Sequence, residues 1–102
     1  LLLLGDVNPG GTLRCTGDIY VLGALRGTAH AGAEGDENAI IAASLMKPMQ
    51  LRIAEVISRP PDEWASSDPW MEYAFLREGS MAIDKIGSLS RLRKEVMQFK
   101  GV

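Results

Sequence analysis

The side chains with the most obvious chemical use in this chain are one histidine and one cysteine. His30 lies among small residues in "TAHAG" and could act as a general base that takes a proton from a hydroxyl or an amine. No carboxylate stands at an obvious position to orient its imidazole ring. Cys15 has no second cysteine for a disulfide, and we interpret it as a small buried apolar residue in a reducing cytosol. The sequence therefore predicts no catalytic constellation.

Two loop patterns are candidate ligand sites. The glycine-rich "GDVNPGG" lacks the Lys-Ser/Thr pair of a phosphate-binding loop, and no helix is predicted after it. Asp6, Asp18 and Asp36 recur near predicted corners of the chain, as in calcium-binding solenoid repeats, but the nonapeptide pattern of those repeats is absent. We predict instead that each aspartate accepts hydrogen bonds from backbone N–H groups of its own turn. Neither a metal nor a cofactor is expected.

Composition indicates an ordinary globular domain. The chain has 102 residues, of which 46% are hydrophobic and 24% charged. Its net charge of -2 argues against a nucleic-acid-binding protein. No apolar run is long enough to span a bilayer, and the initial "LLLL" lacks the basic leader of a signal peptide. We interpret "LLLL" as a strand cut at its beginning, and we expect the chain to start inside a larger protein.

A six-residue period organises the first third of the chain. Two residues before each apolar member of the series lies a glycine or an alanine. A helix repeats at three and four residues, whereas a six-residue period with glycines at the corners is typical of a β-solenoid. Three sides make a coil of eighteen residues, so the spacing predicts an all-β, three-sided β-helix. The apolar series is Val7, Leu13, Ile19, Leu25 and Ala31.

The series is interrupted once and is then followed by other elements. Glu37 falls where an apolar residue is due, so we interpret "GAEGDEN" as a corner enlarged by two residues, after which the series resumes. Pro60-Pro61 ends it, and residues 60–70 are predicted to be a loop that caps the open end. "YAFLREGSMAID" predicts a hairpin about Glu78-Gly79. The resumed series is Ala39, Leu45, Leu51 and Ile57.

The last segment predicts a short terminal α-helix. "SLSRLRKEVMQFKG" is amphipathic and basic, with Ser88 as its cap. Its apolar face could pack on the β-helix, or the helix could lie on an anionic membrane surface. We therefore divide the chain into a β-helix domain, residues 1–86, and a helical extension, residues 87–102.

The alternation of side chains predicts three outer surfaces. One is almost wholly apolar, and either the C-terminal hairpin or helix covers it or a second copy of the chain binds it. A second is small, polar and flat, and suits another protein. The apolar surface comprises Leu2, Leu4, Tyr20, Leu22, Ile40 and Ala42; the second comprises Asp6, Asn8, Arg26, Thr28 and Met46; the third, a solvated face, comprises Thr12, Arg14, His30, Gln50 and Arg52.

The phrases "GDVNPG", "GDIYV", "AHAGA" and "QLRIA", spread over residues 4–57, resemble the C-terminal domain of MinC, the septum-site-determining cell-division inhibitor. "EYAFLREGSMAID" is similar to the closing strands of that domain, while the helix after Ile86 departs from it. The resemblance implies a right-handed β-helix without enzymatic activity. It also implies a homodimer formed through the apolar side, with Leu2, Leu4, Tyr20, Leu22 and Ile40 as candidate interface residues.

The resemblance further implies partners and a location. MinC prevents assembly of the tubulin-like protein FtsZ at wrong septum sites, and its C-terminal domain binds the membrane-associated ATPase MinD. We therefore expect a cytoplasmic protein that MinD recruits to the inner face of the membrane, or a protein of the plastid stroma. The family's Arg-Ser-Gly-Gln contact motif would lie before Leu1. Stacking from that position predicts a MinD surface of Asp6, Asn8, Pro9, Gly10, Arg26, Gly27 and Thr28.

A left-handed hexapeptide-repeat acyltransferase is the alternative. It has the same six-residue period, and His30 would then be the general base at a trimer interface. However, the period lasts only five steps before the interruption, and the coils are few for an acyl-CoA groove. We therefore prefer a binding domain.

Overall fold

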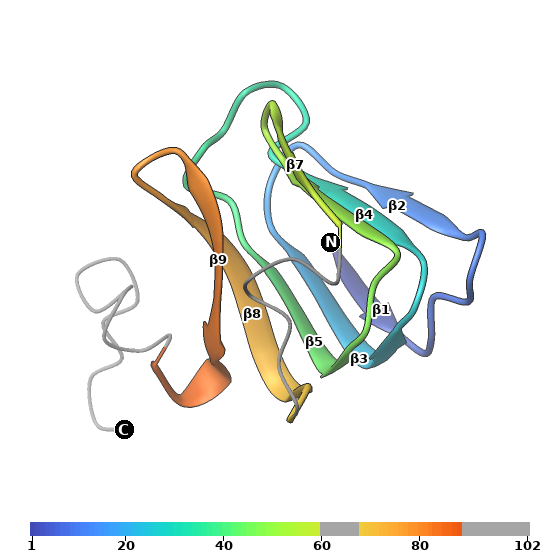
Figure 1. Cartoon of the computed structure of the whole chain (residues 1–102). Coiled ribbons are helices and arrows are strands. Elements are labelled where there is room, and N and C mark those ends of the chain that lie inside the picture. Colours follow the sequence, from blue (N-terminus) through green and yellow to red (C-terminus); the bar gives the residue numbers. More distant parts are fainter. Residues whose placement is uncertain (60–67, 89–102) are drawn as a thin grey trace, which may run out of the picture.

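The computed structural model describes residues 1–59 and 68–88, and these residues form an all-β fold (Figure 1). Nine strands lie in this described part, followed by a single 3-10 turn. They are β1 (Leu2–Leu4), β2 (Thr12–Arg14), β3 (Ile19–Leu25), β4 (Thr28–Ala31), β5 (Ile41–Met46), β6 (Gln50–Ile53), β7 (Val56–Ser58), β8 (Trp70–Arg77), β9 (Ser80–Lys85) and η1 (Ile86–Ser88).

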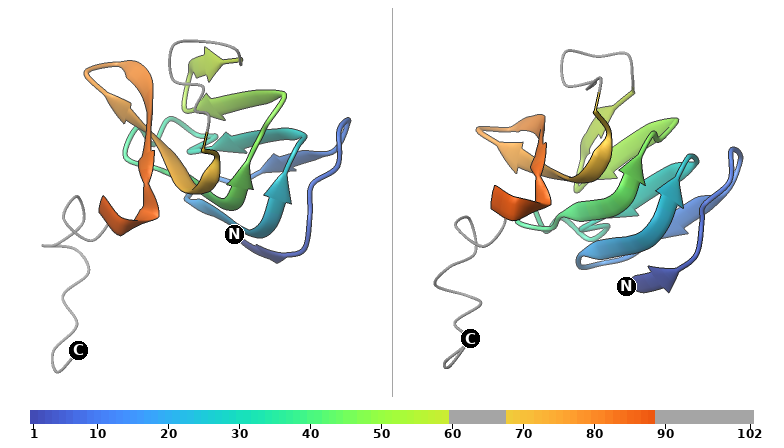
Figure 2. Two further views of the ribbon diagram at one scale, coloured as in Figure 1. Left: turned by 60° about the horizontal axis from the view of Figure 1, so that its bottom comes forward. Right: turned by 90° about the horizontal axis from the view of Figure 1, so that it is seen from below.

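The first six strands alternate between two sheets. Strands β1, β3 and β5 pair in parallel in one sheet, and β2, β4 and β6 pair in parallel in the other. Figure 2 shows the successive coils lying one above another. Because neighbouring strands come from successive coils, each coil hydrogen-bonds to the next over its length. The predicted stacking of short strands is therefore present.

The core lies between the two sheets. All five members of the first apolar series point into it: four are buried, and Leu13 packs against them half-buried. Ile19 and Leu25 have no exposed surface. Each such side chain contributes about 1.5–3 kcal/mol through burial. No coil could bury these residues alone, so the stacking of coils creates the core.

Two glycines allow the coils to approach closely. A Cβ on Gly23 would overlap the carbonyl oxygen of Gly5, and a Cβ on Gly27 would overlap that of Gly11. Both contacts are with the backbone of the coil before, so a side chain could not be accommodated by rotation. The glycine period therefore reflects contact between coils as well as bending at corners.

The third coil corrects the predicted register. Tyr20 pairs with Ala42, so the enlarged corner is two residues longer than predicted, and Ile40 does not follow Tyr20. The corner before β4 is shorter than the period predicts, since Thr12 pairs with Thr28. Thr28 consequently lies on the sheet of the third surface and not on the second. The six-residue period holds within the early sides, but the corners vary in length.

A register shift in β3 corrects two further predictions. Pairing with β5 shifts between Val21 and Ala24, so Leu25 lies beside Met46. Met46 is 3% exposed and belongs to the core, not to the second outer surface. Leu45 pairs with Ala24 and Trp70 and lies outside that core cluster. A bulge displaces one residue of a strand relative to its partner, which exchanges the faces of the residues after it.

The predicted apolar series ends in a hairpin. Strand β7 turns back antiparallel to β6 through Ala54 and Glu55, and Ile57 lies beside Arg52. Ile57 is therefore 50% exposed and is not the inward residue that the period predicts. Ala54 adopts a φ of 52°, a conformation that residues other than glycine rarely adopt. No glycine marks this turn, so the sequence carried no signal for it.

The predicted hairpin about Glu78-Gly79 is confirmed. Strands β8 and β9 pair antiparallel through Arg77 and Ser80, and both turn residues have positive φ, 52° and 80°. Strand β8 also pairs antiparallel with β5 and so extends the first sheet (Figure 1). Of the predicted capping loop at 60–70, residues 60–67 lie outside the described residues, as does the predicted helix beyond Ser88, while Trp70 already belongs to β8.

Candidate partner-binding surfaces

Three leucines form an exposed apolar patch on the first sheet. Leu2 pairs with Tyr20, and Leu4 with Leu22, so these side chains lie on one outer face. Leu2, Leu4 and Leu22 are 60%, 74% and 56% exposed. Contiguous exposed leucines on neighbouring strands are characteristic of an interaction surface. Within the described part of the chain, this part of the predicted apolar side is bare.

The rest of that side is covered by the C-terminal hairpin. Ile40 and Ala42 are buried in a second apolar cluster with Tyr73 and Phe75. The two aromatic rings stack with their centroids 5.1 Å apart. Ile40 is 1% exposed because the hairpin covers this outer face, which is one of the two predicted alternatives, and it therefore offers no side-chain surface to a partner. Tyr20 is half-buried against the cluster, and its hydroxyl donates a hydrogen bond of 3.0 Å to Asp18.

Two exposed apolar residues were missed by the sequence analysis. Trp70 and Met71, at the start of β8, are 59% and 52% exposed. Met71 lies between the residues of β8 that pair with Ala43 and Leu45 of β5, on the same sheet as Leu22. The hairpin was predicted to begin only near Tyr73, and extending its alternation three residues earlier would have found both.

The predicted second side is a corner held by backbone hydrogen bonds. Its loop carries Asp6, Asn8, Pro9 and Gly10, all exposed, and Val7 bridges to Leu25. The N–H of Arg26 donates to the Val7 carbonyl at 2.8 Å, so Arg26 lies directly below Asn8. Gly27 is buried and offers no side chain, and Thr28 lies around the corner on β4. The structure thus brings Asn8, Pro9, Gly10 and Arg26 together.

The corner aspartates join one coil to the next. Asp6 Oδ1 accepts from the Ala24 N–H at 2.7 Å, and Asp18 Oδ1 accepts from the Ile40 N–H at 2.9 Å. Asp36 accepts from its own turn, at the Asn38 N–H. The prediction of local turn formers is therefore confirmed for Asp36, while the carboxylates of Asp6 and Asp18 bind the following coil.

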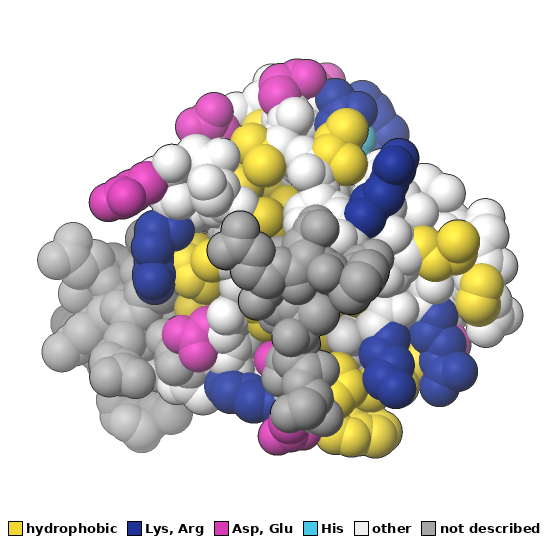
Figure 3. Space-filling model, in the orientation of Figure 1, with side chains coloured by type: hydrophobic (Ala, Val, Ile, Leu, Met, Phe, Trp, Pro, Cys, Tyr) yellow, Lys and Arg dark blue, Asp and Glu magenta, His cyan; other side chains and the backbone are white. Residues whose placement is uncertain are grey.

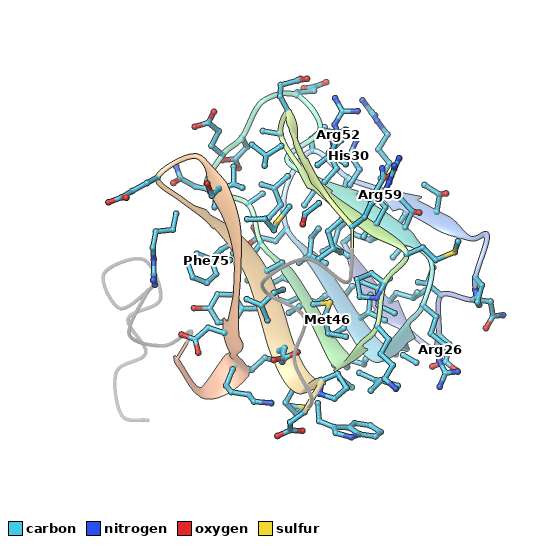
Figure 4. The ribbon with its side chains drawn as sticks, in the orientation of Figure 1. Arg26, His30, Met46, Arg52, Arg59 and Phe75 are labelled. Atoms are coloured by element: carbon cyan, nitrogen blue, oxygen red, sulfur yellow. The ribbon has the colours of Figure 1, made fainter. Side chains whose placement is uncertain are left out.

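The third surface is a polar face whose histidine has a structural partner. Arg14, His30 and Arg52 form one row across β2, β4 and β6. His30 Nε2 lies 3.1 Å from the Ala54 carbonyl oxygen, so its Nε2–H is the donor; Arg52 Nε donates to the same oxygen at 3.0 Å (Figure 4). Arg52 also pairs with Glu55. His30 thus ties β4 to the β6–β7 turn, and among residues 1–59 and 68–88 no carboxylate is bonded to its ring to orient it as a base.

Neither metal nor thiol chemistry is indicated. Within residues 1–59 and 68–88, no three His, Cys, Asp or Glu side chains are grouped as a metal site. Cys15 packs against the core as predicted, but it is half-buried and not fully buried. The N–H of Gly17 lies 3.4 Å from its sulfur and lowers the pKa of the Cys15 thiol. No helix of the described part is long and apolar enough to cross a membrane.

Comparison with known proteins is in agreement with this architecture. The family model "Septum formation inhibitor MinC, C-terminal domain" matches residues 1–86. The probable septum site-determining protein MinC of Bacillus pumilus is 50% identical over 102 residues, which are 99% of this chain and 44% of that protein. The septum site-determining protein MinC of Bacillus subtilis is 49% identical over 102 residues, 99% of the chain and 45% of that protein. The chain therefore spans less than half the length of these relatives.

A solved structure is also similar. A chain of the MinC:MinD cell division protein complex of Aquifex aeolicus has a TM-score of 0.74 and 33% sequence identity, covering 93% of this chain and 78% of that one. The acyltransferase alternative receives no support from these likenesses or from the surroundings of His30. Residues 1–86 match the family model over most of the chain, and the chain belongs to the family of MinC C-terminal domains.

Proposed function

We propose that this chain is the dimerisation and partner-binding domain of a septum-site inhibitor. Its fold would be a right-handed, three-sided β-helix. The two parallel stacks supply two sides, and the Val7–Leu25 bridge at the corner supports the third. Residues 1–86 would be this domain and residues 87–102 its extension. The described surfaces favour a binding module rather than an enzyme.

The first part of the proposal is self-association through the bare leucine patch. Leu2, Leu4 and Leu22 carry it, because water-exposed leucines on paired strands gain free energy when a second sheet covers them. A flat face related to itself by a two-fold axis buries the same patch on both copies. Tyr20 would lie at the border between this interface and the hairpin cluster.

The second part is binding to the ATPase MinD through the corner of Asn8, Pro9, Gly10 and Arg26, with Asp6, Gly27 and Thr28 at its borders. The likeness to a MinC:MinD complex supports this partner. MinD would recruit the chain to the inner membrane face, where the whole protein would oppose FtsZ assembly at wrong sites. The domain itself would stay cytoplasmic and reach the membrane through MinD.

The molar mass in solution tests the first part. We expect a dimer for the unsubstituted chain and a monomer for Leu22→Asp, because a buried carboxylate at the interface would be desolvated without a partner. Thr12→Asp, an exposed strand position on the other sheet, is the matched control and should stay dimeric. A monomeric unsubstituted chain, or a dimer that survives Leu22→Asp, would reject the patch as the interface.

Binding of the chain to purified MinD with ATP tests the second part. Saturable binding is expected for the unsubstituted chain. Arg26→Ala should weaken it, since arginine side chains often carry a large share of interface energy. Absence of any binding by the unsubstituted chain would reject this partner.

A further inference from the structure

A second cation lies directly beneath Arg26. Leu25 pairs with Met46, and the Lys47 N–H donates to the Leu25 carbonyl at 3.0 Å. Since Val7 bridges to Leu25 in the same way, Asn8, Arg26 and Lys47 form one column down three coils. All three residues are exposed. The six-residue period does not place Lys47 beneath Arg26, because this position depends on both the longer corner and the register shift in β3.

The two charges of this column are not neutralised within the described chain. Within the described residues 1–59 and 68–88, the cations of the ion pairs are Arg52 and Lys85. Neither Arg26 nor Lys47 takes part in one. The nearest acidic residue by register is Asp6, whose Oδ1 accepts from the Ala24 N–H. Figure 3 shows neighbouring Lys and Arg side chains at this corner, where Figure 4 labels Arg26.

The backbone holds the two cations next to each other. Adjacent strands of a sheet are about 4.8 Å apart, so the two residues start from neighbouring positions. Gly27, packed against the coil above, follows Arg26, and the buried Pro48 follows Lys47 and restricts its backbone to extended conformations. Stacked like charges repel, and an anion such as a carboxylate bound between them would relieve that repulsion.

We propose that Arg26 and Lys47 together bind an acidic side chain of a partner protein at this corner. The inference rests on the proposed function and names the chemistry of the same site: the partner presents an aspartate or glutamate to the two cations. The column holds two cations, next to the exposed loop of Asn8, Pro9 and Gly10 and to the exposed Met49, whose N–H donates to the Gly27 carbonyl at 2.8 Å. A membrane surface would instead favour a broad cationic face. Two cations in one column are few for a membrane and suit a single protein carboxylate.

The experiment measures the dissociation constant of MinD for the chain at two salt concentrations. Arg26→Gln and Lys47→Gln should each weaken binding about five- to tenfold at low salt and reduce its salt dependence. Lys47→Arg should restore most of the affinity. Arg14→Gln is the matched control: it removes one exposed arginine from the other sheet and should leave binding unchanged. Circular dichroism and molar mass verify that each variant keeps its fold and assembly.

The possible outcomes are distinct. MinD binding that is equal for Lys47→Gln and the unsubstituted chain overturns the carboxylate site and leaves the proposed function standing. No MinD binding by the unsubstituted chain overturns both. Binding of the unsubstituted chain, but not of Lys47→Gln, to phosphatidylglycerol vesicles without MinD would reject the protein carboxylate in favour of a lipid phosphate.

Discussion

At the scale of the residue, glycines that follow the same spacing in the sequence have two different structural roles. Gly27 is buried, and any side chain there meets the backbone of the coil above, whereas Gly17 has open space around it. Gly27→Ala should therefore force the coils apart and lower the free energy of unfolding by about 2–4 kcal/mol. Gly17→Ala is the control and should change it by about 1 kcal/mol or less. Urea unfolding measures both, and equal effects would contradict the close-packing role.

Glu72 makes stability depend on pH in a defined direction. It is 5% exposed, and burial raises its pKa; Asp68 and Asp84 raise it too, while Lys85 opposes the shift. The folded state thus holds its proton at a pH where the unfolded chain has lost it. The contribution to stability is complete below the usual glutamate pKa and is lost as the pH rises through the raised folded value.

Glu72→Gln should remove the loss of stability with rising pH, because glutamine does not ionise. Lys85 keeps partners after the substitution, because its Nζ donates to the carbonyls of Asp68 at 2.6 Å and Trp70 at 3.1 Å. We expect the variant to be at least as stable as the unsubstituted chain at pH 7, with a flatter stability profile from pH about 4 upward. Thermal unfolding across this range measures it, with the exposed Glu34→Gln as control. A marked loss of stability at pH 7 would show that the Lys85 pair outweighs burial.

At the scale of the element, the hairpin of β8 and β9 can be stabilised by a substitution in its turn. Glu78 is exposed and has a φ of 52°, which suits glycine or asparagine in a two-residue turn. Glu78→Gly should relieve the side-chain strain and raise the free energy of unfolding by about 0.5–1 kcal/mol. The exposed Ser80→Gly, in the strand itself, should lower it. Denaturant unfolding measures the free energy of unfolding of both variants. A Glu78→Gly variant less stable than the unsubstituted chain would contradict the turn geometry.

The elements also show what could be predicted from the sequence. The period of Val7, Leu13 and Ile19 reveals the stacked coils because inward residues and corner glycines repeat together. Corner lengths and the shift after Val21 have no such signal, so Met46 was assigned to the wrong face. A one-residue change of register exchanges the two faces of a strand. A small error in the predicted spacing therefore led to a wrong prediction of which side chains are exposed.

The same limit applied to the candidate site. Asn8, Pro9 and Arg26 were predicted by stacking coils on from the position of the family's contact motif, and the bridge between Val7 and Leu25 agrees with that stacking. Lys47 lies beyond the enlarged corner, and its place beneath Arg26 follows only from the observed pairing of Leu25 with Met46. Contacts between distant parts of the chain, such as Tyr73 covering Ile40, depend on tertiary packing.

At the scale of the whole molecule, the covered and bare halves of one sheet face have different consequences. The hairpin places Tyr73 and Phe75 over Ile40 within the chain, so that half contributes to stability at any concentration. The leucine patch on β1 and β3 has no cover in the described chain and, as the proposed interface, would contribute through a second copy. The stability of the molecule should therefore depend on its concentration.

This dependence provides a test that is independent of molar mass. Association with a second folded copy stabilises the folded state by mass action, so Tm should rise as the chain concentration is increased. Leu4→Asp, at the most exposed leucine of the patch, should abolish the rise, while Thr16→Asp, exposed outside the patch, should preserve it. Calorimetry over a hundredfold range of concentration would measure the slope. A Tm that is constant for the unsubstituted chain would mean that the leucine patch binds no second copy, because burial of three leucines cannot be thermodynamically silent.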